Sequence, residues 1–190
     1  MSGKLWYVAR GVERLVKWTG GKKVVWNCIE CTRIKHPTAK PTPDQVRSEV
    51  WMSIIHGSMG LIYFVHEWEP RFNESALLGD REMLAAVTAI NEQIAGLAPV
   101  LNSPTVEDAV TVASSNAKVP MATMVKRHKG ATYLFAVAMR DGKTTATFKL
   151  ENLTGKHAVD VLGEDRTLPS TGGVFGDTFD PYAVHLYRVK

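Results

Sequence analysis

The sequence predicts an α/β region followed by an all-β region, and two changes of pattern along the chain support this. Two continuous apolar runs, residues 24–29 and 61–66, flank a segment with helical spacing, which is typical of a β-α-β unit with parallel strands. From about Val119 the apolar positions alternate and turn residues recur at short intervals, as in antiparallel strands. We therefore expect parallel strands with helices first and a small antiparallel β-sandwich after them.

The first helix is predicted over residues 5–18, because Val8, Val12 and Leu15 share one face and two glycines follow Trp18. The run 24–29 comes next. It lacks alternation, so we expect a strand that is buried on both faces.

A second helix is predicted to begin at Pro43. Thr42 can cap it, proline suits the first helical position, and Gln45 can complete a capping box. This helix should bury Val46 and Val50 and end near residues 56–57, where the second buried strand, residues 61–66, follows.

A third helix is predicted to follow Asp80 and to end at Pro99 and the break at residues 102–104. The β region after it should contain about six or seven strands, a common number in β-sandwiches. Among its turns, Asp141-Gly142 is the strongest hairpin candidate, because these residues tolerate the positive φ of a tight turn.

The composition is that of an ordinary globular protein, with 190 residues, 45% hydrophobic and 22% charged. The net charge is +4, but basic and acidic residues are interleaved, whereas a nucleic-acid interface needs a concentrated basic face. No apolar run reaches the roughly 18 residues of a membrane helix, and the first residues lack the apolar core of a secretory signal. We therefore expect neither a nucleic acid nor a membrane as partner.

Four segments, in this order and spacing, resemble the C-terminal portion of TIM-barrel glycoside hydrolases related to β-galactosidases, together with the β-sandwich that follows many such barrels. They are Pro41–Trp51, His56–Phe64, Ala98–Ser103 and Phe175–Tyr187. The resemblance implies a partial (β/α)8 barrel over residues 1–103, with the last two strands and helices, and a β-sandwich over residues 104–190.

A complete barrel takes about 250 residues, so this chain cannot close one by itself and we expect a fragment of a longer hydrolase. The parent hydrolase would be an exported protein, with its signal upstream. Unclosed strands would leave Val24, Val25, Tyr63 and Phe64 on an open apolar edge, through which the chain could self-associate.

The ends of the two parallel strands hold the candidate site residues, because active sites of TIM barrels lie at the carboxyl ends of the strands. Glu30 ends the first strand, and the resemblance places the nucleophile of retaining enzymes there. Many sequences that resemble the phrase after this strand carry Gln where Glu30 stands, which favours substrate binding instead. A third interpretation is a loop carboxylate paired with Arg33 or Lys35.

Binding of a sugar needs aromatic faces and hydrogen-bonding side chains beside the carboxylates. The candidates are Trp26, Asn27, His66, Glu67 and Trp68. The alternative is that Trp68 packs under the loop at residues 70–72 and that Glu67 is solvated.

Several other polar residues have simpler interpretations. His56 is expected to cap a helix end, and Arg47 and Glu49 to lie on the outer helix of the barrel, where they form structural pairs. Cys28 and Cys31 have a Cys-x-x-Cys spacing, but a buried strand without a second cysteine pair favours neither zinc nor redox chemistry, even with His36 nearby. The histidines of the β region, His128, His157 and His185, show no acidic partner pattern. We expect no metal and no cofactor.

The functional hypothesis is a fragment of a carbohydrate-active glycoside hydrolase that uses two carboxylates when complete. The isolated chain should be inactive, because the second carboxylate would come from a missing strand. A non-catalytic sugar-binding relative and a structural or interaction module are the alternatives.

Overall fold

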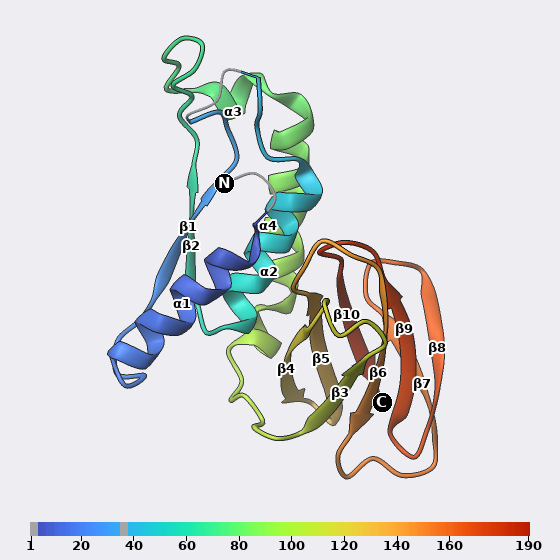
Figure 1. Cartoon of the computed structure of the whole chain (residues 1–190). Coiled ribbons are helices and arrows are strands. Elements are labelled where there is room, and N and C mark those ends of the chain that lie inside the picture. Colours follow the sequence, from blue (N-terminus) through green and yellow to red (C-terminus); the bar gives the residue numbers. More distant parts are fainter. Residues whose placement is uncertain (1–3, 35–37) are drawn as a thin grey trace. The chain divides into compact units, whose positions relative to one another are not determined.

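The computed structural model describes residues 4–34 and 38–190 and divides the chain into two compact units, Met1–Ala95 and Gly96–Lys190. Helices and parallel strands form the first unit, and antiparallel strands form most of the second (Figure 1). The helix α4 (Arg81–Leu101) runs across the division.

The first unit has the predicted β-α-β arrangement. Strands β1 (Trp26–Glu30) and β2 (Gly60–Phe64) are parallel neighbours, and α2 (Pro43–Ile55) connects them. The remaining helices of this unit are α1 (Trp6–Trp18), α3 (Ala76–Gly79) and the first part of α4. The prediction of two adjacent parallel strands bridged by a helix from Pro43 is confirmed.

Local side-chain chemistry fixes the start of α2. The Thr42 hydroxyl accepts from the Gln45 backbone N–H at 3.3 Å, and the Gln45 side chain accepts from the Thr42 N–H at 3.0 Å. This is the predicted capping box, which satisfies two N–H groups that a helix start leaves without partners. At the other end, His56 is the C-cap and its Nδ1 contacts the Met52 carbonyl oxygen at 2.8 Å, as expected for a helix-end residue.

The core of the first unit lies between the strand pair and two helices. Ile29 of β1 packs with Val46 and Val50 of α2 and with Val87 and Ile90 of α4. Only one face of the strand pair is covered in this way. The expectation that both faces of the two strands are buried is wrong for this chain, because Trp26 and Ile62 on the other face are 59% and 49% exposed.

The helix α4 is longer than predicted and continues through Pro99 to Leu101. Asp80 caps its start as expected, since its Oδ1 accepts from the Met83 N–H at 3.2 Å. By length and composition alone, this helix could cross a membrane, with a mean hydropathy of 1.4 over its best window. Val87 and Ile90 of this helix pack in the core of the first unit, and 17% of the window is buried.

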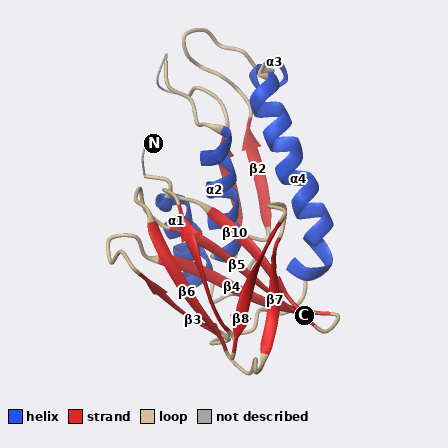
Figure 2. Ribbon diagram, turned by 90° about the vertical axis from the view of Figure 1, so that its right-hand side faces the viewer, coloured by secondary structure: helices blue, strands red, loops and turns tan. Residues whose placement is uncertain are grey.

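The second unit is one eight-stranded antiparallel sheet, with the strand order β3-β6-β9-β8-β7-β10-β5-β4. Its strands can be followed in Figures 1 and 2. The strands are β3 (Val110–Ser114), β4 (Met121–His128), β5 (Ala131–Ala138), β6 (Thr144–Leu150), β7 (Lys156–Val161), β8 (Arg166–Thr171), β9 (Val174–Phe179) and β10 (Val184–Val189). A bridge between Thr105 and Lys126 joins the chain just before β3 to β4, so the sheet is nearly closed. The predicted antiparallel region is confirmed, with eight strands in one sheet instead of six or seven in a sandwich.

The core of this sheet is aromatic and fully enclosed. Phe148, Phe175 and Tyr187 pack together with ring centroids 5.1–5.6 Å apart, and all three are buried. Such contacts add to the free energy of burying the rings. The second unit thus contains a core of its own.

One predicted hairpin is wrong. Strand β5 pairs with β4 and β10, whereas β6 pairs with β3 and β9, so Asp141-Gly142 joins two strands that are not neighbours. Gly142 does not have a positive φ. It is needed for space instead, because a Cβ atom there would lie 2.8 Å from Val119.

Candidate functional site

The register of the parallel strands decides which side chains share a face. Trp26 is paired with Gly60, Cys28 with Ile62, and Glu30 with Phe64. Since alternate residues of a strand point to the same side, these six residues lie on the face that no helix of the first unit covers. Glu30 and Phe64 are at its carboxyl-terminal edge.

Asn27 belongs to the opposite, helix-covered face. Its Nδ2 donates to the Ser53 Oγ of α2 at 2.8 Å, and the Ser53 hydroxyl donates to the Glu49 carbonyl oxygen at 2.7 Å. The amide of Asn27 therefore ties β1 to α2.

Two carboxyl groups interact near the end of β1. Burial and, secondly, the charge of Glu30 raise the pKa of Glu49 to about 7. Burial disfavours a charged carboxylate, and a neighbouring carboxylate disfavours it further. The sequence analysis assigned Glu49 a structural pairing on the outer helix, whereas here burial and the charge of Glu30 act on its carboxyl group.

The two segments that follow the strands are bonded to each other. The Cys31 N–H donates to the Phe64 carbonyl oxygen at 3.4 Å, the Thr32 hydroxyl donates to the His66 carbonyl oxygen, and the Trp68 N–H donates to the Arg33 carbonyl oxygen at 2.9 Å. These bonds continue the pairing of β1 and β2 beyond their ends. His66 and Trp68 therefore lie beside the segment that follows Glu30.

Arg33 forms an ion pair with Glu67. The Arg33 Nε and Nη2 lie 2.7 and 2.6 Å from the Glu67 Oε1, and the Glu67 side chain is 15% exposed. The sequence suggested Arg33 as a partner of Glu30. The pair instead connects the two post-strand segments, and Glu67 is not simply solvated. Lys35, the other suggested partner, lies outside the described residues.

Four ring side chains form a row along the second segment. The edge of the Phe64 ring contacts His66. The His66 and Phe72 rings are stacked, with centroids 6.1 Å apart and an interplanar angle of 19°, and the centroids of Phe72 and Trp68 are 4.9 Å apart. Trp68 and Phe72 are each 52% exposed, so part of their surface faces solvent. The sequence analysis did not name Phe72 as a candidate and included it only in the loop at residues 70–72 under which Trp68 could pack, and the contact between the two rings agrees with that packing.

The remaining candidates lie elsewhere. Trp26 begins β1, four residues before Glu30, which corresponds to about 13 Å along a parallel strand. It covers Gly60, where a Cβ atom would lie 2.6 Å from the indole ring. Trp26 is therefore at the other end of the strand from Glu30.

The two cysteines differ in burial, with Cys28 of β1 exposed and Cys31 buried. Burial and the nearby Cys28 raise the pKa of the Cys31 thiol to about 11, so it is a poor thiolate donor. Within the described residues, no group of three or more His, Cys, Asp or Glu side chains could hold a metal ion. His36, the third candidate of the sequence analysis, lies outside these residues.

The exposed apolar residues near the strand pair are not the ones that the sequence predicted for the open edge. Val24 is 63% exposed, but Val25 is buried, and the exposed apolar surface is formed by Trp26 and Ile62 of the uncovered face. Self-association through this surface stays a prediction.

No family model and no curated protein sequence matches this chain. Several solved structures do match this chain. The α-amylase of Geobacillus thermoleovorans, solved with acarbose, has a TM-score of 0.64 at 8% identity and matches 98% of this chain and 46% of its own. An α-amylase of Anoxybacillus has a TM-score of 0.60 at 12% identity, with 97% and 45% covered.

A GH30 endoxylanase of Clostridium papyrosolvens matches with a TM-score of 0.53 at 13% identity, over 96% of this chain and 46% of its own. The chain thus spans a little under half the length of each of these enzymes. At such identities the likeness concerns the fold alone. The chain shares the fold of a part of glycoside hydrolases.

Proposed function

We propose that this chain is the C-terminal part of a TIM-barrel glycoside hydrolase of the β-galactosidase-related clan, which hydrolyses glycosidic bonds when complete. In this proposal β1 and β2 are the seventh and eighth barrel strands, residues 1–103 belong to the barrel, and residues 104–190 form the β domain after it. The supporting observation is the position of Glu30, which stands at the carboxyl end of two parallel strands beside a partly exposed aromatic row. Active sites of TIM barrels occupy this edge.

The uncovered face of the strand pair, which is called the bare face below, supports the same proposal. Trp26 and Ile62 are about half exposed although both belong to apolar strands. In a barrel this face would point to the interior, where side chains of the other strands would cover it. The occupant of this face would then be the preceding strands of the same protein.

Glycoside hydrolysis needs one carboxyl group that protonates the leaving oxygen and a second that attacks the sugar or activates water. We assign Glu30 to the second role, or to holding the sugar if the nucleophile comes from elsewhere. The acid/base carboxyl would come from a strand outside this chain. Glu49 would influence Glu30 electrostatically, because each carboxylate makes ionisation of the other less favourable.

The rings of Trp68 and Phe72 would stack against a sugar ring, since their exposed faces are apolar and rigid. His66 would donate or accept a hydrogen bond beside them. Glu67 would accept from sugar hydroxyls while Arg33 holds it in place. Trp26 and Asn27 would contribute less, since Asn27 already bonds to Ser53 and Trp26 lies at the far end of β1.

The test is an assay against a panel of aryl glycosides. The chain alone should show no turnover. The protein completed with the coding sequence that precedes it should be active, and Glu30→Gln should lower kcat by about 10²-fold or more if its carboxylate takes part in the reaction. Glu74→Gln, an exposed residue of the same edge, is the matched control and should retain activity. Full activity of the completed Glu30→Gln protein would remove Glu30 from the reaction.

A sugar-binding relative without catalysis is the second candidate, because the aromatic row can bind a sugar without any carboxylate chemistry. In that case the completed protein would show no turnover with any glycoside. It would still bind oligosaccharides, and Trp68→Ala would weaken this binding.

A further inference from the structure

Two histidines of the second unit have polar contacts through their rings, and they differ in what the two ring nitrogens contact. His185 of β10 is two residues from Tyr187, and His157 of β7 is two residues from Val159. Tyr187 and Val159 belong to the core, so both histidines lie on the inner face of the sheet. The contacts of each ring decide how many hydrogens it must carry.

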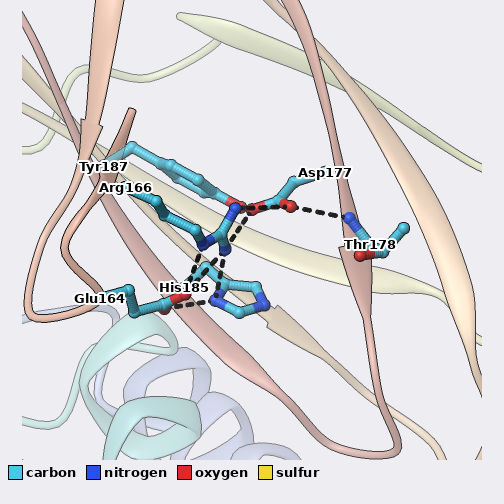
Figure 3. A network of polar contacts seen from close by, with 6 residues as sticks. All are labelled: Glu164, Arg166, Asp177, Thr178, His185 and Tyr187. Atoms are coloured by element: carbon cyan, nitrogen blue, oxygen red, sulfur yellow. Dashed lines mark hydrogen bonds and ion pairs between the residues drawn. The ribbon is translucent and has the colours of Figure 1, made fainter. Parts of the chain in front are cut away.

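His185 belongs to a polar network around Arg166, the first residue of β8 (Figure 3). Asp177 accepts from the Arg166 Nη1 and Nη2 at 2.9 and 2.7 Å and from the Tyr187 hydroxyl at 2.9 Å. Glu164 accepts from the Arg166 Nε and Nη2 at 2.9 and 2.7 Å, and its Oε1 lies 2.5 Å from the His185 Nδ1. One hydrogen on Nδ1 is enough for this contact, so the geometry of His185 does not require a second ring hydrogen.

Both ring nitrogens of His157, in contrast, contact backbone oxygens. Nδ1 lies 2.7 Å from the backbone oxygen of Lys190, which follows β10, and Nε2 lies 2.7 Å from the carbonyl oxygen of Thr154, in the turn between β6 and β7. Such oxygens only accept hydrogen bonds, and a neutral imidazole carries a single N–H. Both contacts are therefore hydrogen bonds only when the ring of His157 carries two hydrogens and a positive charge.

Loss of the proton would remove one of these two bonds. The nitrogen without a hydrogen would present its lone pair to an oxygen lone pair at 2.7 Å, which is a repulsive contact. Hydrogen bonds to the charged form of a group favour that form. The bond to Lys190 and, secondly, the bond to Thr154 accordingly raise the pKa of His157 above its usual value, and burial opposes them as the weakest cause.

The ring lies where the pairing of β7 and β10 ends. These two strands pair over three residues each, Tyr187–Val189 with Val159–Val161. Lys190 comes after the last of these pairs, and Thr154 precedes the first residue of β7 by two positions. His157 thus joins the end of β10 to the turn before β7, beyond the last backbone pair of the two strands.

The charged side chains of the adjoining elements do not account for the charge of the ring. Asp160 is paired with Arg188 at 2.7 Å, and β8 places the uncharged Ser170 opposite His157. None of the charged side chains is among the causes that shift the pKa of His157. The charged residues of these elements are Glu151 of the turn, Lys156 and Asp160 of β7, Arg188 of β10 and Lys190 after it.

We propose that His157 is a pH-dependent clamp, which in its charged form ties the end of β10 to the turn before β7 and which releases one of these segments when it loses its proton. The folded protein binds this proton more tightly than the unfolded chain. The contribution of the clamp is therefore complete below the ordinary histidine pKa of 6.5, and it is lost as the pH rises through the higher pKa of the folded protein. This inference concerns the second unit alone and does not depend on the proposed hydrolase.

The test follows the ring nitrogens of His157 by ¹⁵N NMR in the full chain between about pH 5 and 9, once folded and once unfolded in urea. The pKa of His157 should be higher in the folded chain than in the unfolded chain, and both nitrogens should carry hydrogens at the acidic end. The backbone signals of Thr154 and Lys190 should shift with the same midpoint as the ring. The heteronuclear NOE of Lys190 should fall as the ring loses its proton, because the end of β10 becomes more mobile.

His157→Phe keeps a ring at this position and removes both hydrogen bonds, so the shift of the Thr154 and Lys190 signals with pH should disappear. His128→Phe, at the end of β4, is the matched control, because the His128 ring has no hydrogen bond in the part of the chain that the structure describes. This variant should keep the pH dependence of the parent.

A pKa of His157 that is no higher in the folded than in the unfolded chain would overturn the proposal. So would a shift of the Thr154 and Lys190 signals that persists in His157→Phe. A raised pKa without any matching change at Thr154 and Lys190 would also overturn it, because the ring would then bind a proton without holding either segment.

Discussion

The two units differ in how they bury their strands. The eight strands of the second unit wrap around an aromatic core and nearly close. The two strands of the first unit have helices on one face only, and their other face leaves Trp26 and Ile62 about half exposed. Parallel strands with continuous apolar runs usually have both faces covered. The comparison teaches that the strands of the first unit leave one apolar face without cover among the described residues, whereas the second unit contains a core of its own.

The largest expected effect lies in the network of the second unit. Arg166→Ala would leave Asp177 as a buried carboxylate without its cationic partner, and breaking a buried pair costs about 3–5 kcal/mol. The loss should appear in urea unfolding of the second unit, followed by the NMR signals of β8, β9 and β10, because a chain of two units need not unfold in one step.

Arg188→Ala is the control for this change. Arg188 pairs with Asp160 at 2.7 Å, but both side chains are about a third exposed, and such surface pairs contribute about 1 kcal/mol or less. Equal losses in the two variants would show that the network is no more important to the closed sheet than a surface ion pair.

In the first unit, the next largest effect depends on pH. The pKa of Glu49 is raised to about 7 from 4.5 in the folded protein, so the folded state binds a proton more tightly than the unfolded state. The contribution of Glu49 to the free energy of unfolding is therefore largest below pH 4.5, and it is lost as the pH rises from 4.5 through about 7. Glu49→Gln should remove this fall and stabilise the first unit at pH 8 by about 2–3 kcal/mol at most.

The measurement is the free energy of unfolding of the first unit between pH 4.5 and 8, for the parent and for Glu49→Gln. Glu92→Gln, an exposed residue of α4, controls for the substitution itself. A difference between Glu49→Gln and the parent that stays constant across this pH range would mean that the Glu49 carboxyl does not change its charge there.

Local chemistry explains which features of the fold the sequence predicted. The capping residues Thr42 and Gln45 act within four residues of each other, and the apolar runs on either side of α2 are unambiguous. The prediction of a hairpin at Asp141-Gly142 was wrong because strand pairing is not determined locally. Turn preferences describe a bend in the chain, but they do not choose which strands pair, and here β5 and β6 separate to different neighbours.

The residues of the candidate site also differ in whether local sequence could indicate them. Glu30 and Trp68 could be named as candidates because the sequence pattern itself marks the residues at strand ends. Glu49, Phe72 and the partner of Arg33 were not, because their roles depend on neighbours that are distant in sequence or on a loop conformation. No spacing rule connects a helix carboxyl to the end of the preceding strand.

A smaller effect should separate the two faces of the strand pair directly. Ile29→Val removes a methylene from the covered face, where Ile29 is fully buried, and should cost about 0.5–1.5 kcal/mol. Ile62→Val removes the same group from the bare face and should change the stability by less than about 0.5 kcal/mol. Unfolding of the first unit in urea measures both, and a cost for Ile62→Val as large as for Ile29→Val would show that the bare face is covered in solution, for instance by a second copy.

The smallest expected effect concerns the ion pair between the post-strand segments. The Arg33 side chain is 35% exposed, so the pair is screened by solvent, and Arg33→Met should cost about 1 kcal/mol or less. The Glu67 side chain is better covered and would lose its only charged partner among the described residues. The effect of Arg33→Met on the stability of the first unit should therefore shrink as salt rises to 1 M, where the screening length falls to about 3 Å. Arg71→Met, an exposed residue of the same segment, is the control. A cost for Arg33→Met that does not change with salt would assign the role of Arg33 to the packing of its side chain, and not to its charge.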